Sequence, residues 1–322
     1  MKLIVEGEAK LYTPTLKGIR SSEVFYNRDM MYARDITVAV ASLFHNLYRV
    51  NINMLDAMAA TGVRGIRVLK EVENVERVVF NDINPRAAKL IKKNLELNGI
   101  DKKRYEVLNK DANMLFLERR GEFNFVDIDP IGSPARYLSN VSVCLKNKSL
   151  LAVTATDTAA LYGVYPHTCA RKYGIYSIKT DFSKELGVRI LITAVVRELT
   201  KNDMCFYPIY SHANHYFRVI GIVERGVKKA DECLMNLKYL SYCRRCANRK
   251  IGIMEKCDHC SSDMKIIGPI WAGKIVDREF ISLLIDRLKG ERFDIRELVV
   301  ARDELEYPLY YNIHEMASRL NV

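Results

Sequence analysis

The chain alternates short apolar runs with helix-like stretches through its first 200 residues. The runs cover residues 52–56, 77–80, 105–108, 123–129 and 150–154, and the one at 123–129 is rich in Phe, Val and Ile. Helix signals separate them: Asn84 precedes Pro85 at the start of one stretch, which ends at Asn98-Gly99. This alternation predicts an α/β fold, a parallel sheet with helices on both faces.

Four of the expected strands end in an acidic residue. Asp56, Asp82 and Asp111 follow the first three, and the fourth ends in Asp129. The carboxyl ends of parallel strands meet at the edge where open α/β sheets bind ligands. Because charges are seldom buried unpaired, these four carboxylates indicate a site rather than core packing.

The loop Ala57–Gly65 follows Asp56. Its position between a strand and a helix is typical of a cofactor-binding loop, although its sequence is not. Its small residues let the backbone approach a ligand, but it lacks the full glycine pattern of dinucleotide-binding loops. Asp82 is placed to hold ribose hydroxyls, and Asp111 with the Ala112 N–H to read an adenine edge. NAD and S-adenosylmethionine both suit this arrangement; the missing glycines favour S-adenosylmethionine.

The stretch FNFVDIDPIGSP, Phe123–Pro134, carries the proposed chemistry. The Asp129 carboxylate and the Pro130 carbonyl could accept both hydrogens of an exocyclic amine, orient its nitrogen and take up the leaving proton. The alternative is an ordinary strand-to-helix turn. If the amine interpretation holds, we expect the Asp129 carboxylate to face the cofactor and to be outside any internal ion pair.

Four of the eight cysteines form two CxxC pairs, Cys243 with Cys246 and Cys257 with Cys260, separated by ten residues. This spacing predicts a structural, tetrahedral zinc site with four thiolate ligands and no need for His259. Such a cysteine pattern favours an intracellular protein over a disulfide framework. Basic residues surround the pairs, either as a solvated surface or as RNA-backbone contacts: Arg244, Arg245, Arg249, Lys250 and Lys256.

The length of 322 residues favours two domains, and the net charge of +11 favours a nucleic-acid partner. We expect a catalytic domain over 1–225 and a zinc-binding domain that contacts the nucleic acid over 226–322. No apolar run reaches the roughly 20 residues of a membrane span, and no signal peptide or obligate protein partner is evident. The expected compartment is the cytoplasm.

Taken together, these motifs resemble the tRNA guanine-N2 dimethyltransferases that modify guanine 26. The matching segments are FYNRDMMYARD, LDAMAATGVRGIR, NDINPRAAKLIKKN, DIDPIGSP, TATDTAALYGVYP, HYFRV and GPIWAG, together with the cysteine pairs. The resemblance implies a class I (Rossmann-like) methyltransferase domain followed by a smaller α+β domain, with S-adenosylmethionine, zinc and tRNA as ligands. The cofactor contacts it implies are Arg34, Arg64, Asp82, Asp111 and Ala112.

The same resemblance implies that Asp129 and Pro130 handle the guanine amine and that Phe25 lies near the flipped base or the methyl donor. From the sequence alone, we expect Arg34 and its neighbour Asp35 to face solvent. The family usually has an aromatic residue where Ile131 stands, so another ring would have to stack on the base. The candidates for this ring are Phe25, Tyr26 and Tyr137.

Two alternatives remain open from the sequence. One is a methyltransferase with the same core that acts on a different nucleic-acid amine. The other is a zinc-bearing RNA-binding protein with an inert α/β core. The segment TATDTAALYGVYP, Thr154–Pro166, matches the family but has no chemical explanation of its own.

Overall fold

The computed structural model describes residues 1–14, 24–290, 294–303, 309–312 and 317. The chain divides into two compact units. The first comprises residues 1–129, 140–152 and 282–297, and the second comprises residues 130–139, 153–281 and 298–322. The first segment of the first unit thus ends at Asp129, within the DIDPIGSP stretch. The functional division into 1–225 and 226–322 stays a prediction.

The first unit is built on parallel strands in the order β5-β4-β3-β6-β7. Their bounds are β3 Ile52–Asp56, β4 Val75–Asn81, β5 Tyr105–Leu108, β6 Phe123–Ile128 and β7 Leu145–Ala155, which continues into the second unit. The pairs β3–β4, β3–β6 and β4–β5 are parallel, and Asp56 is the register partner of Asp127. This is the Rossmann-like sheet that the strand–helix alternation predicts.

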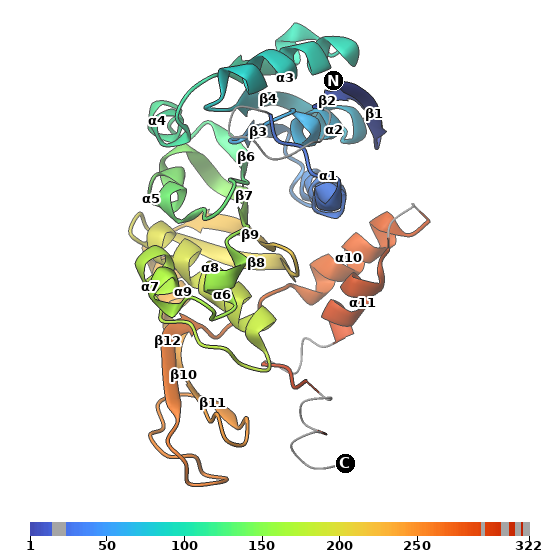
Figure 1. The fold of residues 1–322 in the computed structure, drawn as a ribbon. Helices are drawn as coiled ribbons and strands as arrows, with labels where there is room; N and C mark the ends of the chain where they lie inside the picture. Colours follow the sequence, from blue (N-terminus) through green and yellow to red (C-terminus); the bar gives the residue numbers. More distant parts are fainter. Residues whose placement is uncertain (15–23, 291–293, 304–308, 313–316, 318–322) are drawn as a thin grey trace. The chain divides into compact units, whose positions relative to one another are not determined.

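Helices connect these strands (Figure 1). Their bounds are α1 Met31–Tyr48, α2 Val63–Glu71, α3 Pro85–Leu97, α4 Ala112–Glu118 and the short turns η1 Arg28–Met30 and η2 Lys102–Arg104. The predicted capping of α3 is confirmed, since the Asn84 side chain accepts the Arg86 N–H at 2.9 Å. The Asp111 side chain caps α4 in the same way.

An N-terminal hairpin was not predicted from the sequence. Its strands are β1 Lys2–Glu6 and β2 Ala9–Thr13. Two asparagines of α3 hold β2: Asn94 Oδ1 accepts the Tyr12 N–H at 2.8 Å, and Asn98 Oδ1 accepts the Lys10 N–H at 2.9 Å. These side chains satisfy backbone groups of an edge strand that has no further strand beside it in the described residues.

The second unit holds the last residues of β7 beside an antiparallel hairpin, in the order β7-β9-β8. Its elements are α6 Thr158–Leu161, α7 Pro166–Tyr173, α8 Ser183–Thr200, β8 Met204–Ala213, β9 Phe217–Arg225 and α9 Val227–Met235. Two further helices, α10 Arg278–Leu288 and α11 Arg296–Asp303, each have residues in both units.

A small three-stranded antiparallel sheet, in the order β11-β10-β12, carries the cysteine pairs in its loops. The strands are β10 Leu237–Tyr242, β11 Arg249–Ile251 and β12 Lys265–Trp271. Trp271 fixes β12 to α8, because the Thr193 hydroxyl accepts the Trp271 N–H at 2.8 Å. No helix among the described residues is long and apolar enough to cross a membrane.

Candidate functional site

Four charged residues gather where β3 and β6 end, and we call Asp56, Arg64, Asp127 and Asp129 the strand-end cluster. Arg64, in the first turn of α2, pairs with the Asp129 carboxylate. Its Nη1 lies 3.4 Å from Asp127 Oδ2 and donates to the Thr37 hydroxyl at 2.8 Å. The parallel register brings three carboxylates to one edge, and a guanidinium lies among them.

Asp129 therefore has an internal ion pair, and the expectation that it lacks one is wrong. Its side chain keeps 19% exposure, against 6% for Arg64. The pair uses Oδ2, and within the described residues Oδ1 makes no hydrogen bond. Because Arg64 stays charged at any physiological pH, it holds one oxygen in place while the other can accept a ligand hydrogen.

Asp56 is a buried member of the strand-end cluster. Its residue is only 2% exposed, and its Oδ2 accepts the Gly65 N–H at 3.2 Å. Burial is the main cause that raises the Asp56 pKa to about 7, with Asp127 and Asp129 adding to it and Arg64 opposing it. Asp56 thus supports the start of α2, and its predicted contact with the cofactor stays a prediction.

The loop Ala57–Gly65 is held by Asp82, at the end of β4. Asp82 Oδ2 accepts the Ala60 N–H at 2.8 Å, and its Oδ1 accepts the Asn84 N–H at 2.8 Å. Burial raises the pKa of Asp82. Gly65 lets α2 approach β4 closely, because an added Cβ would lie 2.3 Å from the Phe80 ring. The loop and the start of α3 thus meet at one half-buried carboxylate.

Asp111 is exposed, and its Oδ1 caps α4 by accepting the Asn113 N–H at 2.8 Å, while Ala112 is buried. Two apolar side chains next to these acids are exposed, Ile83 by 68% and Met114 by 56%. Neither was predicted from the sequence. Both are large apolar residues that stand directly after a strand-end acid or within the next helical turn, where an exposed position would favour a polar residue. That pattern could have indicated them as contacts for a ligand.

Arg34 is buried, so the expectation that it faces solvent is wrong. Its Nε and Nη2 donate to Glu6 of the N-terminal hairpin at 2.5 and 2.7 Å, and Nη2 also donates to the Asn27 carbonyl at 3.1 Å. Tyr26 donates to the same Glu6 carboxylate at 2.8 Å, and burial, followed by Glu6, raises the Tyr26 pKa to about 12. The role of Arg34 towards the cofactor stays a prediction.

The residues that follow Asp129 in the chain and the candidate rings differ in exposure. Pro130 is buried, Phe25 is half-buried, and Ile131 is 74% exposed. Tyr137 is only 6% exposed, and the Arg136 guanidinium lies 4.6 Å from its ring centroid. Tyr137 is therefore wrong as a candidate ring for stacking on a base, which leaves Phe25 and Tyr26.

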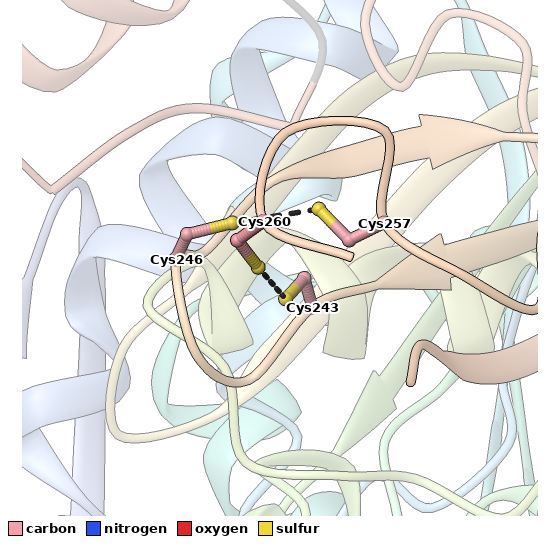
Figure 2. Close-up of side chains that lie close together, drawn as sticks. All are labelled: Cys243, Cys246, Cys257 and Cys260. Atoms are coloured by element: carbon pink, nitrogen blue, oxygen red, sulfur yellow. Dashed lines mark hydrogen bonds between the residues drawn. The ribbon is translucent and has the colours of Figure 1, made fainter. Parts of the chain in front are cut away.

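The four predicted zinc ligands converge (Figure 2), and we call Cys243, Cys246, Cys257 and Cys260 the cysteine cluster. Their sulfurs all lie within 4.8 Å of one another. The pairs Cys243–Cys260 and Cys246–Cys257 are each separated by 3.5 Å. Sulfurs bound tetrahedrally at 2.3 Å from zinc would be about 3.8 Å apart, so these side chains fit the ion.

The surroundings of the cysteine cluster also suit thiolates. Asn248 Nδ2 lies 3.5 Å from Cys257 Sγ, and bonds from the Ser262 side chain and backbone lower the Cys260 pKa to about 6. Met264 is buried against the cluster. His259 is not among the converging ligands in the described residues. Hydrogen-bond donors around bound sulfurs are a usual feature of metal sites.

Of the basic residues near the cysteines, Arg249 has a structural role. It is 8% exposed, lies 2.5 Å from the Asp181 carboxylate and has its guanidinium 4.0 Å from the ring centroid of Tyr311. Neither alternative from the sequence, solvated surface or RNA contact, holds for it. Arg244, Arg245, Lys250 and Lys256 are exposed.

The chain is similar to known proteins over its whole length. The family model of the N2,N2-dimethylguanosine tRNA methyltransferases matches residues 6–322. A tRNA (guanine(26)-N(2))-dimethyltransferase of Methanosphaera stadtmanae is 36% identical over 99% of this chain and 85% of its own. A tRNA (guanine(26)-N(2)/guanine(27)-N(2))-dimethyltransferase of Aquifex aeolicus is 34% identical over 100% of this chain and 86% of its own.

A solved structure agrees with these relatives. Trm1 of Pyrococcus horikoshii, in complex with S-adenosyl-L-methionine, is 30% identical to this chain. The two superpose with a TM-score of 0.84 over 100% of this chain and 88% of that one. The chain belongs to the N2,N2-dimethylguanosine tRNA methyltransferase family.

Proposed function

We propose that this protein transfers one or two methyl groups from S-adenosylmethionine to the exocyclic N2 of guanine 26 in tRNA. The observation that carries the proposal is the Asp129 carboxylate at the end of β6. One of its oxygens is held by Arg64 and the other has no partner within the described residues. The names of the relatives support the substrate and the position.

The proposed cofactor site lies along the ends of β3, β4 and β5. Asp82 would bind the ribose hydroxyls, and Asp111 with Ala112 would contact the adenine edge, with Ile83 and Met114 offering exposed apolar contacts. Asp56 would act through the loop it supports, and Arg34 and Arg64 would lie near the methionine end. S-adenosylmethionine, when bound, supplies an electrophilic methyl group.

In this proposal Asp129 both orients the amine and accepts its proton. The lone pair of a guanine amine is delocalised into the ring, so the nitrogen needs to be held towards the methyl carbon. Asp129 Oδ1 accepts one N–H, and the Pro130 carbonyl accepts the other. The new N–C bond would form as the S–C bond of the donor breaks, with S-adenosylhomocysteine as the leaving group. The nitrogen then becomes strongly acidic, and Asp129 Oδ1 would take up its proton.

The same geometry allows two rounds of transfer. After the first methylation the nitrogen still has one N–H, which Asp129 Oδ1 can accept in a second round. We place Phe25 near the extruded base or the methyl donor, as the family resemblance implies; its ring is half-buried, whereas the Tyr26 hydroxyl is held by Glu6. A stacked ring is worth about 1–3 kcal/mol per base.

We assign zinc to the cysteine cluster as a structural ion, because four thiolates leave no open position. The domain 226–322 would contact tRNA through the exposed basic residues beside the cluster, Arg244, Arg245 and Lys250. We expect the protein to work in the cytoplasm, where thiols stay reduced.

The test is nucleoside analysis of unmodified tRNA after incubation with the protein and methyl donor. We expect N2-methylguanosine first and N2,N2-dimethylguanosine later, both lost when guanine 26 is replaced by adenine. A matched tRNA with guanine 27 replaced by adenine distinguishes a second target position. Methylation of another base, or none at all, would contradict the proposal.

A further inference from the structure

Two segments of the second unit, Thr154–Pro166 and the loop 130–134, are bonded to each other. The Gly132 N–H donates to Thr156 Oγ1 at 2.6 Å, and the Thr156 N–H donates to the Gly132 carbonyl at 2.9 Å. Gly132 has a φ of +93°, a conformation that glycine adopts easily. Because glycine has no side chain, contacts from other residues have to fix this conformation. The reciprocal pair of bonds therefore sets the backbone two residues after Pro130.

A partly buried chain of hydroxyl groups fixes the next residue, Ser133. The Ser133 hydroxyl donates to the Tyr173 oxygen at 2.9 Å, and the Tyr173 hydroxyl donates to Asp157 Oδ1 at 2.6 Å. Lys172 Nζ lies 2.9 Å from the other oxygen of Asp157. Tyr173 is only 3% exposed, and burial together with Asp157 raises its pKa, so the phenol keeps the proton that it donates.

We infer that Thr156, Asp157 and Tyr173 are positioning residues, which hold the loop 130–134 so that the Pro130 carbonyl points at the guanine amine. The inference rests on the proposed function of Asp129 and Pro130 and explains the TATD part of a segment that had no chemical account. A carbonyl accepts an N–H well only in a narrow range of directions. Holding its backbone before the substrate arrives reduces the entropy lost on reaching the reactive geometry.

The test uses substitutions that remove one bond and keep the shape. Tyr173→Phe removes the hydroxyl between Ser133 and Asp157, and Thr156→Val removes the acceptor of the Gly132 N–H. We expect kcat for guanine methylation to fall about 10- to 100-fold in each. The affinity for S-adenosylmethionine and the KM for tRNA should stay within about twofold, because neither residue is proposed to contact these ligands.

Two control variants separate positioning from loss of fold. Thr156→Ser keeps a hydroxyl acceptor and should retain most of the activity. Tyr165→Phe removes the hydroxyl of a tyrosine that is 60% exposed, at the start of the same helix as Tyr173, and should behave as the unsubstituted protein. Thermal unfolding of all four variants shows whether a loss of kcat comes with a loss of stability.

Amide hydrogen exchange of Ile131, Gly132 and Ser133 gives a readout besides activity. We expect faster exchange in Tyr173→Phe and Thr156→Val than in their controls. Unchanged exchange, or a kcat within twofold of the unsubstituted protein, would overturn the inference alone. An unsubstituted protein that methylates no tRNA guanine would overturn the proposed function, and the inference with it.

Discussion

The strand-end cluster and the cysteine cluster both gather acidic side chains, but they balance the resulting charge in different ways. In the strand-end cluster the Arg64 guanidinium pairs with Asp129 and lies 3.4 Å from Asp127. In the cysteine cluster the sulfurs of four cysteines lie within 4.8 Å of one another, in an arrangement that fits a zinc ion.

This difference indicates which of the two sites needs its ligand in order to fold. The strand-end cluster carries its own cation, so the methyl-donor site is expected to be formed before the donor binds. The cysteine cluster lies in loops of a three-stranded sheet, and a sheet of that size has little core of its own. Three changes to the protein test this difference between the two clusters.

Removing zinc should have the largest effect. Cys257→Ser, or a strong chelator, should reduce bound zinc from about one ion per chain to almost none and expose residues 237–271 to proteases. Structural zinc contributes about 10–16 kcal/mol in small domains. S-adenosylmethionine affinity should change less than about threefold. Cys144→Ala, a buried cysteine outside the cluster, serves as control, and full protease resistance without zinc would contradict the prediction.

Removing the Arg64 guanidinium should have the second-largest effect. Arg64→Met leaves Asp127 and Asp129 without the guanidinium and should lower the free energy of unfolding by about 3–5 kcal/mol, as breaking a buried ion pair does. Urea denaturation measures this. Arg64→Lys keeps the charge but loses the fork geometry, so its loss should be smaller. Equal stability of Arg64→Met and the unsubstituted protein would show that the cluster does not depend on Arg64.

The smallest effect concerns pH. The Asp56 pKa is raised in the folded state, to about 7, so this residue's contribution to stability is largest below pH 4 and is lost as the pH rises to about 7. Asp56→Asn can still accept the Gly65 N–H but cannot ionise. It should flatten the fall in unfolding free energy over this range by about 1 kcal/mol or more. An unchanged pH profile in this variant would contradict the raised pKa.

The sequence predicted what depends on local spacing. Strand ends, the Asn84 cap of α3 and the convergence of two CxxC pairs follow from residues near each other in the chain. These features rest on the period of the strand and helix patterns and on the geometry of a short knuckle. For the same reason, the predicted order of the strands from β3 to β7 agrees with the structure.

Long-range partners could not be predicted. Arg64 and Asp129 are 65 residues apart, and Arg34 and Glu6 join a helix to a hairpin that has no clear strand signal. A single sequence does not say which of many arginines meets which acid. The burial of Tyr137 was also missed, since a single sequence does not show which side of a helix is covered.

The central claim is that Asp129 orients the guanine amine through the oxygen that Arg64 leaves open. The most direct test is the single-turnover rate of methyl transfer to tRNA by Asp129→Asn, at saturating S-adenosylmethionine. Asn can still bond Arg64 but is a poorer acceptor and cannot take a proton. The account predicts a rate at least about 100-fold lower with nearly unchanged cofactor affinity. A rate within threefold of the unsubstituted protein would contradict it.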